Sequence, residues 1–242
     1  MNVLIAGASG ATGRLLVEQL LDRGIAVRII VRPQSNLPES FTDRENLTIA
    51  RATLLDLDDK ELADQVRGCD AIASCLGHNL TFKGVYGQPR RLVTDATRRL
   101  CNAAIANQPE THVKFVLMNT VGNRNRDLNE EISLAQKGAI GLMRLLLPPQ
   151  ADNEEAAEFL RTEVGQNHAV IEWAAVRPDS LTDDKHVTPY DEYPSPIRSA
   201  LFDPGKTSRI NVAHFMAELI TNPEKWDAWK GQMPVIYNSE AQ

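Results

Sequence analysis

Three glycines near the N-terminus have the spacing of a loop that binds phosphate groups. Gly7, Gly10 and Gly13 follow the apolar run 3–6 and precede leucines at helical spacing. Glycine can adopt a positive φ and has no Cβ to hold a ligand away from the backbone. The first turn of the helix that follows would direct free N–H groups and a positive dipole end at an anion. The strand–turn–helix context therefore predicts a nucleotide site rather than a structural turn.

The spacing G-x-x-G-x-x-G differs from the G-x-G-x-x-G of the common dinucleotide fingerprint. We expect the loop backbone and the first helical turn to hold the pyrophosphate of a dinucleotide. The residues predicted to contact the cofactor in this stretch are Gly7, Ser9, Gly10, Ala11, Thr12, Gly13 and Arg14.

The end of the second apolar run predicts which dinucleotide binds. Sites that prefer NAD usually place an acidic residue here, where it binds the ribose 2′-hydroxyl. In this chain Arg32 follows the run 26–31, and no acid is adjacent. A guanidinium suits a 2′-phosphate in both charge and forked geometry. NADP(H) is therefore the predicted cofactor.

Two further charged residues have alternative interpretations. Arg14 is either a second cation for the 2′-phosphate or a solvent-facing helix residue. Asp56 accepts from the adenine amino group, or only caps the helix that follows, or does both. Its neighbour Leu57 is also predicted to contact the cofactor.

Apolar periodicity and turn residues divide the chain into alternating strands and helices. Strands are predicted at 2–6, 26–31, 47–50, 70–76, 113–118, 169–176 and 234–237. Helices are predicted at 12–23, 56–66, 90–107, 142–147, 152–164 and, capped by Asn211, 211–220. The segment 180–208, with its four prolines at 189, 194, 196 and 204, is predicted to form loops.

This alternation predicts an α/β fold, a doubly wound parallel sheet of the Rossmann type with helices on both faces. No repeat or linker divides the chain, so residues 1–242 are predicted to form one domain. Segment 178–208 is expected to be a small C-terminal substrate lobe, a lid over the site. Ligands of such sheets bind outside the carboxyl ends of the strands, where strand order reverses. At this edge we expect, besides the glycine loop, Leu76, Gly77, His78, Asn119 and Thr120.

Composition excludes several other classes of protein. The net charge of −6 argues against nucleic acid as a partner, and no run approaches the ~20 apolar residues of a membrane span. Cys69, Cys75 and Cys101 form no C-x-x-C pair, so neither a disulfide scaffold nor a metal site is expected. The N-terminus has no signal-like segment, which favours a cytoplasmic location.

The sequence resembles the atypical short-chain dehydrogenase/reductase family of NAD(P)-binding Rossmann-fold proteins. Within it, the chain is similar to the flavin/biliverdin reductases and the NmrA-like proteins. The segments that carry the resemblance are 7–13, 31–32, 54–56, 69–71, 157–161, 176–178 and 208–211. The resemblance implies that the nicotinamide lies near Thr120 and the residues after Leu76.

The chain departs from the family at the proton-transfer residues. Family members that reduce a carbonyl use a Tyr-x-x-x-Lys pair, in which the lysine lowers the pKa of the tyrosine. Gln150 and Glu154 stand at those places, and neither can replace the pair. Asn153 and Ala157 stand where flavin/biliverdin reductases carry histidines.

The candidates that remain for catalysis are Thr120 and His78. The Thr120 hydroxyl either orients a substrate carbonyl or the nicotinamide amide, or is satisfied by the backbone. His78 titrates in a useful range, and its alternative interpretation is a polar surface residue. Further candidates in loops or in the lid are Lys83, Tyr86, Lys137, Tyr190 and Tyr193.

Two functions are consistent with these residues. The first is an NADPH-dependent oxidoreductase that reduces a small conjugated substrate such as a flavin, quinone or enone by hydride transfer. Such chemistry needs little help from protein acids, because the redox chemistry belongs to the cofactor and the acceptor. The second is a non-catalytic NADP(H) redox sensor or scaffold of the NmrA type, which binds a protein partner. We favour the oxidoreductase.

Overall fold

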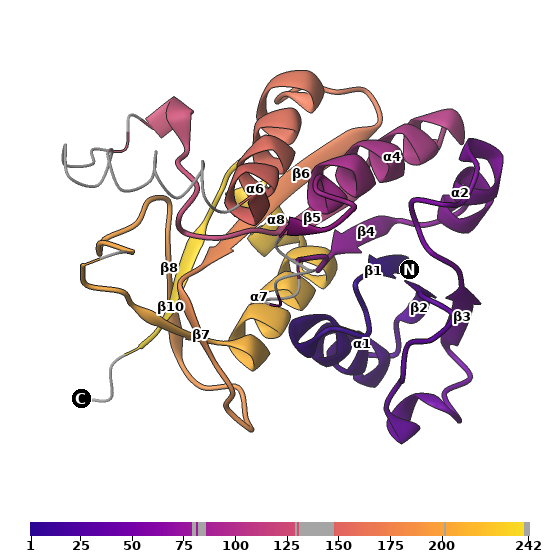
Figure 1. The fold of residues 1–242 in the computed structure, drawn as a ribbon, viewed down its shortest axis with the longest axis horizontal. Coiled ribbons are helices and arrows are strands. Elements are labelled where there is room, and N and C mark those ends of the chain that lie inside the picture. Colours follow the sequence, from indigo (N-terminus) through magenta and orange to yellow (C-terminus); the bar gives the residue numbers. More distant parts are fainter. Residues whose placement is uncertain (79–80, 82–85, 129, 131–147, 201, 240–242) are drawn as a thin grey trace.

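An eight-stranded sheet runs through the molecule in the order β3-β2-β1-β4-β5-β6-β10-β8 (Figure 1). The computed structural model describes residues 1–78, 81, 86–128, 130, 148–200 and 202–239. The strands are β1 (Asn2–Ala6), β2 (Ala26–Val31), β3 (Leu47–Arg51), β4 (Ala71–Ser74), β5 (Val113–Met118), β6 (Ile171–Pro178), β8 (Tyr190–Tyr193) and β10 (Val235–Asn238).

Seven of these strands are parallel, and β8 alone runs antiparallel to its neighbour β10. Val3 of β1 pairs with Val27 of β2 on one side and with Ala71 of β4 on the other. β4 is buried along its whole length, as expected of a central strand covered on both faces. The predicted doubly wound Rossmann-type sheet is thereby confirmed.

Two layers of helices cover the sheet (Figure 1). Alternate residues of β1 point to opposite layers, because side chains of a strand alternate in direction. Ile5 packs in the core on the side of α1 and α7, and Leu4 packs in the core on the side of α2, α4 and α6. The helices are α1 (Ala11–Asp22), α2 (Asp59–Val66), α4 (Leu92–Ala106), α6 (Pro148–Phe159), α7 (Arg209–Thr221) and α8 (Pro223–Trp229).

Short helical turns complete these layers. Two 3-10 turns lie at Glu39–Phe41 and Arg126–Leu128, and α6 continues into a π-helical turn over Leu160–Val164. The predicted helix at 142–147 lies outside the described residues. No helix in the described ranges is long and apolar enough to cross a lipid bilayer.

Three predicted helix starts were wrong by a few residues, and one of these helices, α6, begins at Pro148 rather than at Asp152. α2 is capped by Asp58, whose side chain accepts from the Glu61 backbone N–H at 2.7 Å, while the Glu61 carboxylate accepts from the Asp58 N–H at 2.8 Å. Asp56 therefore does not cap this helix. α7 is capped by Ser208, and Asn211 lies inside the helix with its N–H bonded to the Ser208 hydroxyl.

The prediction that 180–208 consists only of loops was also wrong. β7 (Ser180–Thr182) and β9 (Lys206–Ser208) form a two-stranded parallel sheet, and β8 extends the main sheet beyond β10. Each strand has only three or four residues, and the prolines between them hide the pattern.

Arg177, in the motif 176–178, ties this C-terminal lobe to the sheet. Its side chain is fully buried and ion-pairs with both carboxylate oxygens of Glu130, at 2.7 and 3.1 Å. The remaining guanidinium N–H groups donate to the carbonyls of Met233 (2.6 Å), Asn123 (2.8 Å) and Pro194 (3.0 Å). All five N–H donors of the guanidinium are thus used, so Arg177 has a structural role.

Candidate functional site

The reversal of strand order lies between β1 and β4. From β1 the chain continues to β2 and β3 on one side, whereas β4 leads to β5 and β6 on the other. Ala6 pairs with both Ile30 and Ser74, so the carboxyl ends of three strands are level at this point. The segments that follow these ends, 7–13, 32–35 and 75–78, therefore share one edge of the sheet. In doubly wound sheets this is the place where ligands bind.

Gly7 fits the glycine loop against the end of β4. It has a φ of +82°, and a Cβ on it would lie 2.6 Å from the carbonyl carbon and oxygen of Cys75. Any side chain here would be strained and would also collide with backbone atoms. Burial raises the pKa of the Cys75 thiol to about 12, so this thiol is neutral.

Gly13 fits α1 against the same loop. A Cβ on Gly13 would lie 2.1 Å from the Gly7 carbonyl oxygen, and that oxygen also accepts from the Gly10 N–H at 3.0 Å. Gly10 is the N-cap of α1, so no side chain caps the helix, and its first turn contains no acidic residue. The N–H groups at the start of α1 thus remain for an anion. This backbone cradle fits the pyrophosphate of a dinucleotide.

The side chains of the loop differ in exposure. Thr12 is buried with 5% of its surface exposed, and Ser9 is partly buried. Ala11 and Arg14 face solvent at the start of α1. The loop therefore offers backbone N–H groups and the partly buried hydroxyl of Ser9, and it is followed by the cation of Arg14.

The end of β2 carries the predicted cation. Arg32 is exposed, and neither Arg32 nor Arg14 forms an ion pair with any of the described residues. Arg51, at the end of β3, donates to the carbonyls of Pro33 and Ser35, each at 3.2 Å. Arg51 thus holds the loop that follows Arg32, a contribution that the sequence analysis missed.

The segment after β3 is held from α4. Asp56 is exposed and Leu57 is half-buried. Arg99 of α4 donates to the carbonyls of Leu55, at 2.7 Å, and Leu57, and it ion-pairs with Asp59 at 3.2 Å. The backbone beside the predicted adenine position is therefore fixed by a residue that the sequence analysis did not single out.

The residues after β5 have mixed roles. Asn119 is buried, accepts from the Thr120 N–H at 2.8 Å, and donates to the Asn153 carbonyl of α6 at 2.9 Å. Asn119 therefore joins this edge of the sheet to α6. The Thr120 hydroxyl accepts from the Gly122 N–H at 3.3 Å, which leaves its own hydrogen to donate.

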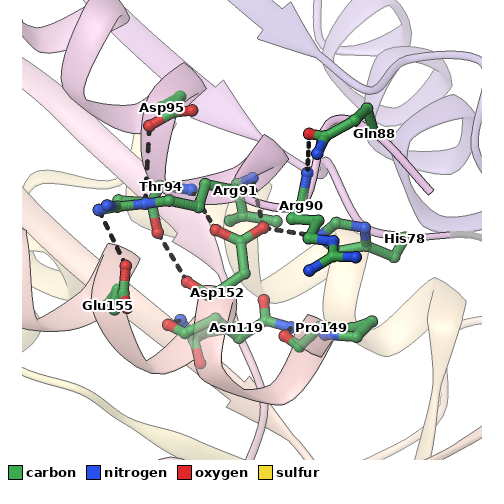
Figure 2. Close-up of polar contacts among 12 residues, drawn as sticks. His78, Gln88, Arg90, Arg91, Thr94, Asp95, Asn119, Pro149, Asp152 and Glu155 are labelled. Carbon is green, nitrogen blue, oxygen red and sulfur yellow. Dashed lines mark hydrogen bonds and ion pairs between the residues drawn. The ribbon is translucent and has the colours of Figure 1, made fainter. Parts of the chain in front are cut away.

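His78 follows Leu76 and the exposed Gly77, and its ring contacts a carboxylate from α6 (Figure 2). Its Nε2 lies 2.6 Å from Oδ2 of Asp152, and the exposed fractions of the two side chains are 4% and 1%. His78 is thus a buried, paired group rather than a polar surface residue. The sequence predicted Asp152 only as a helix start. Its bonding partners lie far from it along the chain, and such partners leave no local pattern in the sequence.

The Asp152 carboxylate also accepts hydrogen bonds from the first N–H groups of α4. Its Oδ2 accepts from the Val93 N–H at 2.8 Å and its Oδ1 from the Thr94 N–H at 2.9 Å, while the Thr94 hydroxyl donates to its carbonyl at 2.9 Å. Burial by itself would raise the pKa of Asp152. Hydrogen bonds from His78, Thr94 and Val93 outweigh burial and lower that pKa, so the carboxylate is ionised.

Gln150 and Glu154, at the positions of the family's Tyr/Lys pair, do not replace that pair. Gln150 donates to the Gly122 carbonyl at 3.3 Å and to the Glu154 carboxylate at 3.1 Å. Asn153 donates to the Pro149 carbonyl, and Ala157 is buried.

Of the further candidates for catalysis, Tyr190 has a hydrogen-bond partner and Tyr86 is exposed. The Tyr190 hydroxyl lies 2.8 Å from Nδ1 of His214, and Tyr86 is 42% exposed. The Tyr193 ring contacts the ring of Tyr237, with 6.0 Å between their centroids. The remaining two, Lys83 and Lys137, lie outside the described residues.

The fold and the glycine loop define a Rossmann-type nucleotide-binding protein. A family model described as NAD(P)H-binding matches residues 7–223. The chain therefore belongs to the NAD(P)H-binding family.

Several solved structures share this fold. The oxidoreductase ylbE from Lactococcus lactis is 18% identical, with a TM-score of 0.70 over 100% of this chain and 92% of that one. A short-chain dehydrogenase/reductase from Veillonella parvula in complex with NADP is 14% identical, with a TM-score of 0.69 over 98% and 94% of the two chains. A Rossmann-fold NAD(P)-binding family protein from Shigella flexneri is 20% identical, with a TM-score of 0.62 over 100% and 97%.

A curated relative matches a shorter stretch. An uncharacterised chloroplastic protein from Arabidopsis thaliana is 47% identical over 59 residues. These residues span 24% of this chain and 21% of the Arabidopsis protein.

Proposed function

We propose that this protein is an NADP(H)-dependent oxidoreductase that reduces a small conjugated substrate such as a flavin, quinone or enone. The observation that carries the proposal is the backbone cradle of Gly7, Gly10 and Gly13 at the reversal of strand order, which opens onto an uncapped helix start. NADPH bound there would supply a hydride from its nicotinamide ring.

The exposed cations support NADP(H) rather than NAD(H). Arg32 stands where an NAD site has an acid, and Arg14 is exposed at the start of α1. We assign the 2′-phosphate to Arg32, with Arg14 as a second cation. With Asp58 as the cap of α2, Asp56 has no capping role, which favours its assignment, with Leu57, to the adenine end.

At the nicotinamide end, we propose that Leu76, Gly77 and Asn119 flank the cofactor. Thr120, through its hydroxyl hydrogen, and His78 would position the acceptor. The lobe that contains 178–208 would cover the substrate as a lid. A cytoplasmic location and the absence of a nucleic-acid partner stay predictions.

The test is oxidation of NADPH by the purified protein in the presence of a flavin, a quinone and an enone in turn. We expect consumption of NADPH with at least one acceptor, and loss of that activity in Gly13→Val, whose side chain would collide with the Gly7 carbonyl and distort the cradle. If none of the three acceptor classes is reduced while NADPH binds, the oxidoreductase proposal is wrong.

The alternative is a redox sensor that binds a protein partner. It is favoured by Gln150 and Glu154, which bond to each other where a reductase would carry its Tyr/Lys pair. Calorimetric titration with NADP⁺ and NADPH separately, followed by partner capture in the presence of each, tests it. Equal affinities and no partner specific to one form would contradict the sensor.

A further inference from the structure

We propose that Asp152 is a positioning residue that fixes the tautomer of His78. In this arrangement the neutral His78 ring carries its hydrogen on Nε2. The proposal rests on the proposed function only for its catalytic consequence, because the tautomer can be measured without any substrate.

The hydrogen bonds of the Asp152 carboxylate carry the argument. Backbone N–H groups can only donate, and the N–H groups of Val93 and Thr94 each point at one carboxylate oxygen, at 2.8 and 2.9 Å. Both oxygens therefore act as acceptors, which matches the ionised carboxylate. His78 Nε2 approaches Oδ2 to 2.6 Å, the distance of a charge-assisted hydrogen bond.

The tautomer follows from this environment. An ionised carboxylate oxygen has no hydrogen to give, so the nitrogen that faces it must carry one. A neutral imidazole carries a single N–H, so Nδ1 is left as the basic nitrogen. The 1% exposure of Asp152 keeps water from competing for these oxygens.

The position of the pair gives this assignment a functional meaning. His78 follows β4 at the cofactor edge, and Asp152 lies on α6 between Gln150 and Glu154. α6 thus contributes a group that acts through His78 at the segment where other family members place their Tyr/Lys pair. In the proposed reaction the hydride would pass from NADPH to the acceptor. The accompanying proton would reach the acceptor from solvent, while the His78–Asp152 bond would hold the segment 75–78 in place beside the acceptor.

The first experiment measures the tautomer by long-range ¹H–¹⁵N correlation spectra of ¹⁵N-histidine-labelled protein over a pH series. His78→Gln assigns the signal. In the wild-type protein we expect the neutral ring to carry its hydrogen on Nε2. In Asp152→Asn the side-chain amide can donate to the ring, so the population should move toward the Nδ1–H form.

Asp95→Asn is the matched control, because Asp95 lies in the first turn of α4, whose N–H groups Asp152 accepts from, and its side chain is 47% exposed. It should leave the His78 tautomer unchanged. A wild-type ring with its hydrogen on Nδ1 would overturn the proposal even if Asp152→Asn fails to fold. So would an Asp152→Asn protein that folds and keeps the wild-type tautomer.

The second experiment uses the acceptor that the wild-type protein reduces. Misplacement of a positioned group can cost about 10²-fold in rate, and we expect Asp152→Asn to lose about 10²-fold in kcat while the KM for NADPH changes little. An unchanged kcat would contradict the catalytic consequence. If no acceptor is reduced by the wild-type protein, the proposed function fails and the tautomer assignment is judged by the spectra alone.

Discussion

The Cβ that Gly7 lacks would lie 2.6 Å from the carbonyl oxygen of Cys75, so the glycine loop and the end of β4 touch through backbone atoms alone. This contact joins two segments that are 68 positions apart in the sequence. It places the start of the cradle beside the residues that lead to His78.

Replacement of Gly7 by alanine should therefore cost more than backbone strain. Gly68 has a similar φ of +71°, but its missing Cβ has no neighbour within 4 Å. Gly68→Ala measures the strain of the left-handed backbone alone, about 1 kcal/mol. Gly7→Ala adds the collision, and we expect about 1–3 kcal/mol more. Urea unfolding of both variants checks this, and equal losses would contradict the close fit.

Replacement of Arg32 by alanine should weaken the binding of NADPH much more than the binding of NADH. Hydrogen bonds to charged groups contribute about 1.5–3 kcal/mol, which corresponds to a roughly 10- to 100-fold loss of NADPH affinity. Arg44→Ala is the control, since the side chain of Arg44 is 38% exposed and pairs with Asp22 instead. Calorimetric titration gives both affinities. Equal losses for the two cofactors would show that Arg32 does not read the 2′-phosphate.

Replacement of Glu130 by glutamine should destabilise the whole fold. It leaves the buried Arg177 guanidinium without its counter-charge, and removal of one partner of a buried pair costs about 3–5 kcal/mol. Glu163→Gln removes the carboxylate of an exposed pair with Arg98 and should leave the melting temperature nearly unchanged. A melting temperature of Glu130→Gln close to that of wild type would refute the structural role of Arg177.

The stability of the protein should fall in acid partly through Asp152. Its pKa is lower in the folded protein than the ordinary value of 3.8, so the unfolded chain binds more protons between the two values. This contribution is fully present above pH 3.8 and is lost as the pH falls through the folded pKa. Denaturant unfolding over an acid pH series should show a shallower pH dependence for Asp152→Asn. The same slope in both proteins would contradict the lowered pKa.

Patterns that are local in the sequence predicted most of the fold. The run 3–6, the three glycines and the leucines of α1 are contiguous, so periodicity alone places the loop. The helix start at α2 was wrong because Asp56, Asp58 and Asp59 offer several caps within four residues. α8 was missed although Asn222 and Pro223 give a start signal, and Asn222 indeed accepts from the next N–H groups.

Contacts between distant segments could not be predicted in this way. The partners of Asp152 are at positions 78, 93 and 94, and those of Arg177 include residues 123, 130, 194 and 233. No spacing in one sequence marks such pairs, because they depend on how α6 and the C-terminal lobe pack. The proposed substrate end of the site depends on contacts of this kind.

α4 is attached at two positions, and their spacing fixes the distance between two parts of the candidate site. Thr94 in its first turn is bonded to Asp152 beside His78, and Arg99 grips the carbonyls of the segment after β3. Five residues of helix, about 7.5 Å, separate these attachments. The helical rise therefore sets the distance between the Asp152 contact and the segment after β3. One residue inserted between them would turn the two attachments by about 100° relative to each other. This spacing therefore tolerates side-chain substitutions far better than insertions.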